Sequence, residues 1–521
     1  MTLYNGADDN RLTVQVRDIS GGLNSRQHAS GIKPNQVAIL YNVDLAVPGQ
    51  ASKRPGIVLL EDLGDADAGI GCLGFNPIES TNANELLVWH GQKLEGSSVV
   101  AGVLDTFVHH KTDITTTGEQ TNAFQAFRSG SGSCVLFKNT TDDWMQYDPN
   151  DTPVVTVLTD SGNTNPPKEA TIGCFFRGRA WLVGNNYAWF SDAYPSTYAT
   201  TFSQSANAYN IPIGKERAAI PVRDTGIIFL GQEAIYGLNP SMTPAATDKP
   251  EKLLDIGCVA AKTAQNVGDD VFFLAPDGVR GVFRTVQDKL QLTQSFPLSF
   301  VLKDQFEDIN WAQIEKATAI WWSNMYMIAL PTGSSTHNDV VWVYYPANQS
   351  WSVITGWSVG DWDIVNVAGE ERLYYIAADE DKVYRAWTGY SDAGTAINYQ
   401  EEGRKEDMGQ PLTKKVGGEV EVKANNAGNY NLSVWASVDE QDYASLGNLN
   451  LSSVGPVVGT GVVGTAVLVG ESIVKDKFSI WGLGEWSTIQ IKLQHNATNG
   501  SDTITVYERN IVTYPSEYYS E

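Results

Sequence analysis

A recurring hairpin unit between about residue 61 and residue 400 constrains the fold of this chain most strongly. Each unit holds an apolar or aromatic strand, a Gly, Asn or Asp turn, and a second strand that ends near an aromatic residue. Corresponding points recur on average about every 47 residues, at Val103, Tyr147, Trp189, Tyr236, Phe283, Tyr344 and Tyr384. A period of about 40 to 50 residues is typical of propeller blades, so we predict an all-β chain whose residues 61–400 form a β-propeller of about seven blades.

Four segments show the hairpin pattern most clearly, at residues 134–149, 180–191, 271–283 and 341–353. Two successive β-sandwiches would also give short strands with frequent turns, and they remain the alternative architecture. Neither WD-type blade signatures nor the box of sialidase-like propellers occurs in the sequence. Only Leu298 to Ala317 has the composition of a helix of a few turns, and we expect it to cap one blade.

A charged connection at residues 400–407 marks the predicted boundary between two domains. After it, residues 420–424, 430–438, 487–493 and 503–507 alternate polar and apolar side chains, which predicts half-buried antiparallel strands. We therefore expect a C-terminal β-sandwich at residues 401–521. Its uncharged Gly/Val-rich segment, 455–470, fits either an internal hairpin or a surface buried against another subunit.

The N-terminal residues 1–60 have a different texture, which predicts an irregular arm. Gly21 and Gly22 allow a turn that side chains would forbid, and Pro34 with residues 35–41 could open one short helix. An extended stretch at 42–45, a Pro-Gly turn at 47–50 and a basic stretch at 53–56 follow. Such Gly, Pro and polar content cannot bury a core alone, so we expect residues 18–56 to contact other subunits.

This order of parts resembles the N-terminus of the tail nozzle or hub proteins of short-tailed bacteriophages. In that family a GGLN-type segment precedes an N-V-D stretch, a Gly turn and a basic R-P-G, as residues 21–24, 42–44, 49 and 54–56 do here. The resemblance is close over about forty residues. It continues more loosely through the propeller-like middle to the DMGQP sequence at 407–411 and the β-rich C-terminus.

The resemblance implies a structural, non-enzymatic virion protein of the tail, assembled in the bacterial host cytoplasm. It would form a homo-hexameric ring below a dodecameric adaptor on the portal, contact distal needle, fibre or tailspike proteins, and pass viral DNA without binding it specifically. The assembly contacts would lie on the segment that carries the resemblance, at Gly21, Gly22, Leu23, Asn24, Asn42, Asp44, Arg54 and Pro55.

The charge of the chain is compatible with such a channel and argues against a nucleic-acid-binding protein. Acidic residues outnumber basic ones by 60 to 36, which gives a net charge of −24. No charged segment precedes an apolar one at the N-terminus, and no long apolar run occurs, so we expect no membrane insertion. Four widely spaced cysteines, Cys72, Cys134, Cys174 and Cys258, fit buried reduced thiols.

Cofactor and metal motifs are weak in this sequence, and we expect neither a cofactor nor a metal. Residues 459–464 match G-x-G-x-x-G, but β-branched residues and Gly follow where a dinucleotide site needs a helix. The six histidines are scattered, and the adjacent His109 and His110 should point to opposite faces of a strand. Residues 65–69 hint at a calcium loop but lack its terminal glutamate, and a solvated acidic loop explains them better.

An enzyme is the main alternative in function. Glycoside hydrolysis needs only two carboxylates at a set separation, but nothing in the sequence distinguishes one pair of Asp and Glu residues from the others. We therefore assign no catalytic residue. A propeller-type glycan-degrading enzyme and a receptor- or carbohydrate-binding module of the virion stay open beside the structural role.

Overall fold

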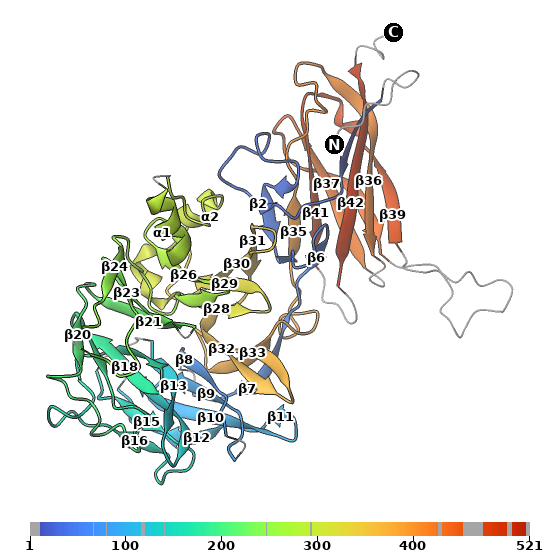
Figure 1. The fold of residues 1–521 in the computed structure, drawn as a ribbon. Helices are drawn as coiled ribbons and strands as arrows, with labels where there is room; N and C mark the ends of the chain where they lie inside the picture. The colour runs from blue at the N-terminus through green and yellow to red at the C-terminus, as the bar shows by residue number, and fades with distance from the viewer. Residues whose placement is uncertain are drawn as a thin grey trace.

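The computed structural model describes the chain apart from residues 1–10, 66, 80, 116–119, 140, 224, 246, 292–293, 426–429, 452–472, 497–502 and 517–521. Strands make up 50% of the chain and helices 5%, which confirms the all-β prediction. A β-propeller forms the larger body and a β-sandwich stands beside it (Figure 1). The Gly/Val-rich segment 455–470 lies outside the described residues.

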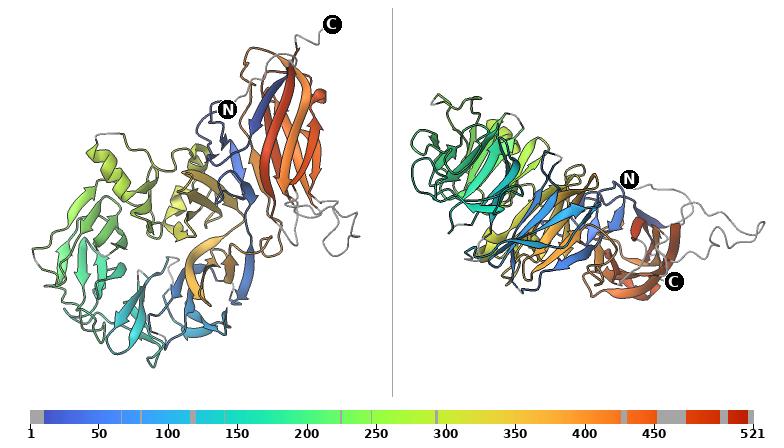
Figure 2. Two further views of the ribbon diagram at one scale, coloured as in Figure 1. Left: turned by 45° about the vertical axis from the view of Figure 1, so that its right-hand side comes forward. Right: turned by 90° about the horizontal axis from the view of Figure 1, so that it is seen from below.

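The propeller is a ring of antiparallel sheets whose inner strands contact one another in sequence (Figure 2). The sheets, in chain order, are β8 (Gly69–Phe75), β9 (Glu85–His90), β10 (Lys93–Val100), β11 (Val103–Leu104) and β12 (Val108–Lys111); β13 (Asn122–Arg128), β14 (Gly132–Lys138), β15 (Met145–Tyr147) and β16 (Val155–Val157); β17 (Ile172–Phe176), β18 (Arg179–Gly184), β19 (Tyr187–Phe190) and β20 (Ala208–Asn210); β21 (Glu216–Val222), β22 (Gly226–Gly231), β23 (Ile235–Leu238) and β24 (Glu251–Leu254); β25 (Gln265–Val267), β26 (Asp270–Ala275) and β27 (Gly278–Gly281); β28 (Thr318–Trp322), β29 (Met325–Leu330), β30 (Val340–Tyr345) and β31 (Ser350–Thr355); β32 (Val359–Val367), β33 (Glu370–Ala377) and β34 (Lys382–Ala386).

The blade count needs a correction. Among the described residues six of these sheets are self-contained blades, one fewer than the predicted count of about seven. The remaining repeat, β28 to β31, lies in the ring between β25 and β32, but its sheet continues into the sandwich to make nine strands. The sequence period reports hairpin repeats and cannot show that one of them shares its sheet with another domain.

The N-terminal strand β7 (Ile57–Asp62) closes the ring. It pairs with β34 and is the outer strand of the sheet that begins with β32, while the chain directly after it enters the first blade at β8. The inner strands β32 and β8 then contact each other. The last blade is thus built from both ends of the propeller sequence.

The aromatic period has a structural meaning. Five of the seven predicted points, Tyr147, Trp189, Tyr236, Tyr344 and Tyr384, lie on the third strand of their sheets, in β15, β19, β23, β30 and β34. The other two do not correspond, because Val103 lies on β11 and Phe283 lies in a helix. The four predicted hairpins are confirmed, at β14–β15, β18–β19, β26–β27 and β30–β31.

Strand β9 shows why the middle of a blade strand is apolar on both faces. Its Leu87 and Trp89 pack with the next blade, whereas Leu86 and Val88 pack with Val365 and Val367 of the preceding one. Successive side chains of a strand point to opposite faces, and both faces of a blade are covered by neighbours.

The C-terminal sandwich is confirmed, but it holds strands from both ends of the chain. One sheet contains β39 (Ile473–Ser479), β36 (Lys415–Asn425), β42 (Thr505–Pro515), β6 (Ala51–Lys53) and β5 (Val43–Asp44), with β1 (Leu12–Val16) paired to β42 and β40 (Glu485–Trp486) paired to β36. The other contains β4 (Ile39–Tyr41), β35 (Tyr399–Glu402), β41 (Ile489–His495), β37 (Asn431–Val438) and β38 (Ala444–Asn450), and β4 joins it to β31. A single turn of 3-10 helix, η2 (Trp481–Leu483), precedes β40.

The prediction that residues 1–60 form an arm before the propeller is wrong for the described residues 11–60. Leu23, Val37, Leu40, Val43 and Leu45 are at most 1% exposed and belong to the main hydrophobic core of this chain. The blue N-terminal strands lie among the red C-terminal ones (Figure 2). Polar and Gly-rich segments need not bury a core alone when two domains supply the other side of it.

The helix predicted from Pro34 is also wrong, because residues 36–37 and 39–41 form β3 (Gln36–Val37) and β4. β3 pairs in parallel with β2 (Gly22–Leu23), and β4 fills the space between β31 and β35. These pairings outweigh a local helical preference.

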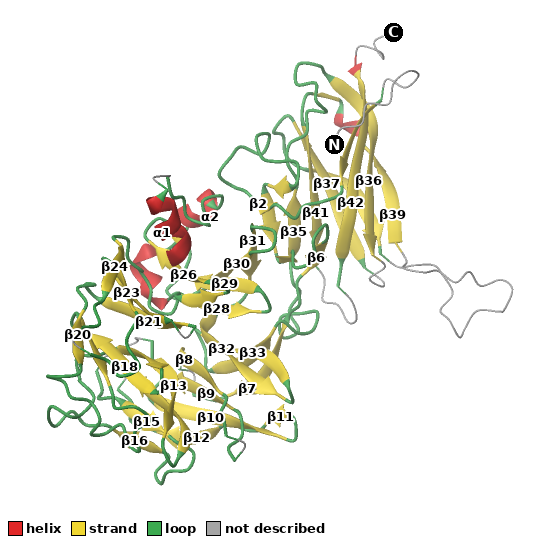
Figure 3. Ribbon diagram, in the orientation of Figure 1, coloured by secondary structure: helices red, strands yellow, loops and turns green. Residues whose placement is uncertain are grey.

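Few helices occur in the described chain: the larger ones lie on one side of the propeller, and the short η2 lies in the sandwich (Figure 3). The predicted helix at 298–317 is present only as two short pieces, α2 (Lys303–Glu307) and the 3-10 helix η1 (Trp311–Lys316). An unpredicted helix, α1 (Val282–Leu290), follows β27 directly.

Candidate functional site

The Gly21–Asn24 stretch makes a tight turn against the propeller. The Gly21 N–H donates to the Asn35 carbonyl at 3.0 Å, and Gly22 has a φ of +64°. A Cβ atom at Gly22 would lie 2.6 Å from the Trp351 carbonyl oxygen, so only glycine fits there. Leu23 is fully buried, and Asn24 Nδ2 donates to Gln36 Oε1 at 2.9 Å.

Arg54 lies at the centre of the contact between the two domains. Its side chain is fully buried and donates to both carboxylate oxygens of Asp392, at 2.9 and 2.7 Å. Nη2 also donates to the Thr355 carbonyl at 3.1 Å, and the guanidinium stands 4.7 Å from the ring centroid of Trp357. The Trp357 indole N–H donates to the same carboxylate at 3.0 Å.

Asn42 completes this cluster, because each of its amide atoms is used. Its Oδ1 accepts from Arg54 Nε at 2.9 Å and from the Thr355 N–H at 3.0 Å. Its Nδ2 donates to Thr355 Oγ1 at 2.9 Å and to the Asn398 carbonyl at 2.8 Å. We call Asn42, Arg54, Thr355, Trp357 and Asp392 the junction cluster, since they tie the N-terminal segment to the end of β31 and to the chain before β35.

The structure therefore corrects the predicted assembly contacts. Leu23, Asn24, Asn42 and Arg54 are each at most 6% exposed in this chain, and Gly22 is buried as well, so their side chains cannot form a contact surface. Gly21, Asp44 and Pro55 keep partial exposure. Burial raises the pKa of the Asp44 carboxyl, although the Ala46 N–H bond to it at 2.9 Å acts in the opposite direction.

Exposed residues of the same N-terminal segment lie in two loops beside these buried anchors. One loop holds Arg26, Gln27, His28 and Lys33, and the other holds Ala46, Val47 and Pro48. Arg26 stacks on Phe300 with 3.5 Å between its guanidinium carbon and the ring centroid. These loops, rather than the motif residues, are the part of the segment that another subunit could reach.

Two carboxylates on the inner strand β32 hold neighbouring blades together. Asp361 on β32 accepts the Cys72 N–H of β8 at 2.8 Å, Thr318 Oγ1 of β28 at 2.9 Å, and Lys262 Nζ at 2.5 Å. Asp363 accepts the Gly74 N–H at 2.9 Å, and burial raises its pKa to about 6. These oxygens are occupied by structural hydrogen bonds rather than directed at open space.

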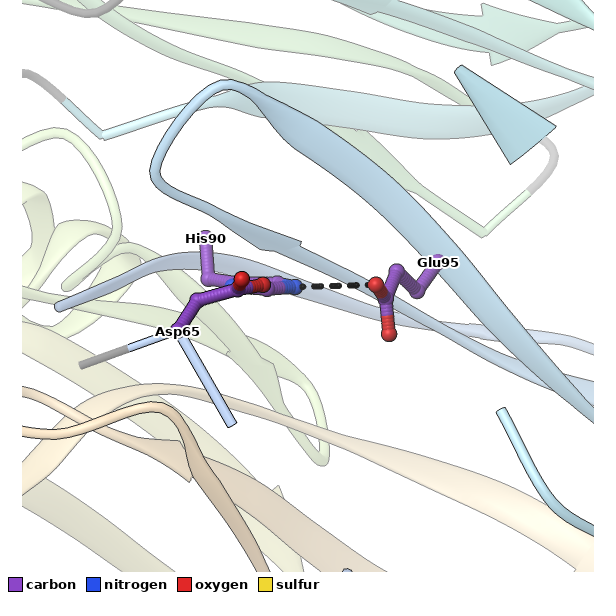
Figure 4. A group of neighbouring side chains, drawn as sticks. All are labelled: Asp65, His90 and Glu95. Atoms are coloured by element: carbon purple, nitrogen blue, oxygen red, sulfur yellow. Dashed lines mark ion pairs between the residues drawn. The ribbon is translucent and has the colours of Figure 1, made fainter. Parts of the chain in front are cut away.

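The histidines behave only partly as the sequence indicates. His109 and His110 do point to opposite faces of β12, toward Glu95 at 2.6 Å and Glu85 at 2.7 Å. Among the described residues, one group could hold a metal ion through three different side chains, and it contains Asp65, His90 and Glu95 (Figure 4). Asp65 belongs to the acidic loop, but His90 and Glu95 come from β9 and β10, and only the fold shows their proximity.

The other sequence features show no site in the part of the chain that is described. All four cysteines are free and buried, and burial raises their thiol pKa values. The G-x-G-x-x-G match at 459–464 lies outside the described residues. No described helix is long and apolar enough to cross a membrane. Two small hollows both lie where Val16 and Arg509 meet in the sandwich, away from the propeller.

The fold thus defines a β-propeller fused to a β-sandwich through a shared N-terminal segment. No family model and no curated protein matches the chain. A solved extracellular domain described as part of a hybrid two-component system from B. thetaiotaomicron is 9% identical, with a TM-score of 0.41 over 63% of this chain. The chain spans 39% of the length of that structure.

Two further solved structures are forms of an exo-β-1,3-galactanase from Phanerochaete chrysosporium. The form with galactose is 7% identical, with a TM-score of 0.25 over 77% of this chain and 96% of the enzyme. A variant with β-1,3-galactotriose is 10% identical, with a TM-score of 0.28 over 88% of this chain and all (100%) of the variant. Similarity at this level carries no conclusion about the activity of this chain.

Proposed function

We propose that this chain is a structural component of a short-tailed phage tail, a nozzle or hub subunit that forms part of the DNA ejection channel below the portal and adaptor. The observation that carries the proposal is the position of the N-terminal segment that resembles this family. Its GGLN turn, Asn42 and Arg54 each have a defined structural task where the propeller meets the sandwich. A chance match to an irregular segment would not be expected to coincide with such a junction.

The proposed assembly is a homo-hexameric ring, with the adaptor on one side and needle, fibre or tailspike proteins on the other. The two exposed N-terminal loops, at residues 26–33 and 46–48, are the proposed contact points, because the buried motif residues on either side of each loop hold it in place. The firm tie between propeller and sandwich suits a subunit that must keep its shape while DNA passes.

The acidic charge supports a channel through which duplex DNA slides. A chain of net charge −24 repels phosphates, whereas a basic wall would bind them with strong salt dependence. The free protein is expected to bind a labelled duplex more weakly than about 10⁻⁴ M at physiological salt. Tight binding in a fluorescence anisotropy titration would contradict the sliding channel without contradicting a place in the tail.

The decisive test is the protein content of tailed particles made by cells that carry this gene. Gradient-purified particles are expected to contain the chain at a fixed ratio to the portal protein, in a copy number that is a multiple of six. Quantitative mass spectrometry measures this ratio. Its absence from the particles would overturn the proposal.

The enzymatic alternative has a separate test. The ring carboxylates of the buried Asp361 and the half-buried Asp363 are engaged in bonds between blades, which speaks for a non-enzymatic role. Incubation of the full chain with host surface polysaccharides should release no reducing ends. A sustained release, lost on substitution of one carboxylate without loss of folding, would favour the glycan-degrading function instead.

A further inference from the structure

We propose that Asp65, His90 and Glu95 form a binding site for a divalent transition-metal ion, with Zn²⁺ as the preferred ion. The site lies on the first blade, where the chain arrives from the ring-closing strand β7. It is independent of the proposed tail function, because it rests only on the contacts of these three side chains and their neighbours.

The fold brings the three residues together from two directions. His90 is the last residue of β9 and stands opposite Lys93 in the β9–β10 register, so Glu95, two residues further along β10, points to the same face. Asp65 reaches this face from the connection between β7 and β8 (Figure 4). Its backbone N–H donates to the Asp381 carboxylate, which fixes the connection beside the last blade.

His90 is the observation that points to a ligand. Its side chain is fully buried, and neither ring nitrogen has a hydrogen-bond partner among the described residues. Nδ1 stands 3.8 Å from Asp65 Oδ2, and Nε2 stands 3.5 Å from Glu95 Oε1. A buried imidazole left without hydrogen bonds is destabilising, so an arrangement that directs it at two carboxylates needs an explanation.

The separations suit a shared cation better than direct hydrogen bonds. Two ligand atoms bound at about 2.1 Å in tetrahedral geometry stand about 3.4 Å apart, close to the 3.5 Å between His90 Nε2 and Glu95 Oε1. One ligand atom from each of the three residues lies within 4.8 Å of the other two. A single ion binds only one ring nitrogen of His90, so an ion held by all three residues requires one of the two carboxylates to turn from the nitrogen that it faces toward the other nitrogen.

Two neighbouring side chains contact the carboxylates of the site without the ion. Lys93 Nζ lies 2.6 Å from Asp65 Oδ2, and its side chain, at 27% exposure, can turn toward water when a metal takes its place. His109 Nδ1 lies 2.6 Å from Glu95 Oε1. This contact would orient the Glu95 carboxylate from outside the ligand set, as outer partners of metal ligands commonly do.

The ligand types select the ion. An imidazole with two carboxylates suits Zn²⁺ and related transition metals, whereas Ca²⁺ and Mg²⁺ prefer sites made of oxygen atoms alone. The bound ion would fasten the β7–β8 connection to the β9–β10 hairpin. Because β7 belongs to the last blade and β9 to the first, the bound ion would link the two blades that meet where the ring closes.

The test uses the full chain, freed of any histidine tag and of metal, titrated with ZnCl₂ by calorimetry. One Zn²⁺ per chain is expected, together with a rise in Tm of about 3 °C or more at saturating Zn²⁺. Mg²⁺ and Ca²⁺ should give neither effect.

Two variants and a control locate the site. His90→Gln and Asp65→Asn are expected to weaken Zn²⁺ binding at least about tenfold, and Asp65→Asn keeps the test decisive if the buried His90 is needed for folding. His28→Gln is the matched control, since His28 is exposed and also faces a carboxylate, Glu440, at 3.2 Å. Absence of Zn²⁺ binding, or unchanged binding in a folded Asp65→Asn, would overturn the proposal.

Discussion

Arg54 and Asp392, which are 338 residues apart in the sequence, form a bidentate ion pair inside the contact between the two domains. The guanidinium is fully buried, and the carboxylate is 11% exposed. The pair also holds Trp357 through the indole N–H and the face of its ring. This one contact unites the N-terminal segment, the ring and the chain that leads into the sandwich.

Removal of one partner of this ion pair should be strongly destabilising, because it leaves the other charge buried and unpaired. Arg54→Met is expected to lower the free energy of unfolding by about 3–5 kcal/mol, measured from urea denaturation followed by tryptophan fluorescence. Lys303→Ala is the control, since Lys303 and Glu307 form an exposed helical pair at 3.7 Å. That change should stay within about 0.5 kcal/mol of the parent. An equally small effect of Arg54→Met would contradict the role of the junction cluster.

Alanine substitutions at Gly22 and Gly49 distinguish the cost of a positive φ angle from the cost of a steric clash. Both have positive φ values, +64° and +78°, but a Cβ atom at Gly49 meets nothing within 4 Å, whereas one at Gly22 meets the Trp351 backbone. Gly49→Ala should therefore cost about 1 kcal/mol, and Gly22→Ala at least about 2 kcal/mol more. Urea midpoints of the two variants give the difference. Equal losses would mean that the Gly21–Asn24 turn can move away from Trp351.

The burial of Lys53 predicts that the free energy of unfolding depends on pH in the alkaline range. It is 2% exposed, its ammonium has no hydrogen-bond partner among the described residues, and burial together with Arg54 lowers its pKa to about 8. Between this value and the 10.5 of a free lysine, the unfolded chain binds more protons than the folded one. The free energy of unfolding should therefore rise with pH across this window.

The substitution Lys53→Met isolates this effect. It should remove the alkaline rise and stabilise the protein at pH 7 by about 2 kcal/mol, because a buried charge without a partner is replaced by an apolar side chain of similar length. The exposed Lys33→Met serves as the control and should change neither quantity. Thermal denaturation from pH 7 to 10, compared between the variants, measures both. If Lys53→Met is instead less stable than the parent protein at pH 7, the Lys53 ammonium makes stabilising interactions in the folded chain.

Deletion of residues 1–56 should unfold the sandwich and spare the propeller. The truncated chain still begins with β7, which closes the ring, but it lacks β1 and β6 beside β42 and β4 between β31 and β35. Limited proteolysis should cut within 399–515 and leave 57–392 resistant. A chain that begins at Arg11 keeps all described strands and is the control. If the shorter chain instead folds completely, the N-terminal segment is the separable docking arm that its composition indicates.

Local patterns in the sequence were enough to predict the propeller, and the reason is physical. Blade hairpins pair residues only a few positions apart, so Asn185 and Asn186 at the turn between β18 and β19 already indicate the pairing of their neighbours. Helix α1 could have been found as well. Its buried Val282 and Thr285 and the partly buried Val286 follow the three- and four-residue spacing of one helix face.

Long-range pairing explains what local patterns could not predict. Residues 39–41 look helical after Pro34, but their partners are Glu401 and Gln400 in β35 and Val353 in β31, all more than 300 residues away. The candidate metal ligands are equally hidden, because Asp65 and His90 become neighbours only when β9 folds back against β8. The burial of Arg54 is hidden in the same way, since its partner Asp392 lies 338 residues further along the chain.

The pairing of β1 with β42 also governs the order in which this protein can be made. Thr13 pairs with Val512, so nearly the whole chain must leave the ribosome before the first strand finds its partner. At about 5–20 residues per second, this strand waits for about 25–100 seconds. The propeller can close earlier, once β34 has emerged to meet β7. During translation the ring can therefore be complete before the sandwich, and β1 must wait for a strand that is made about 500 residues after it.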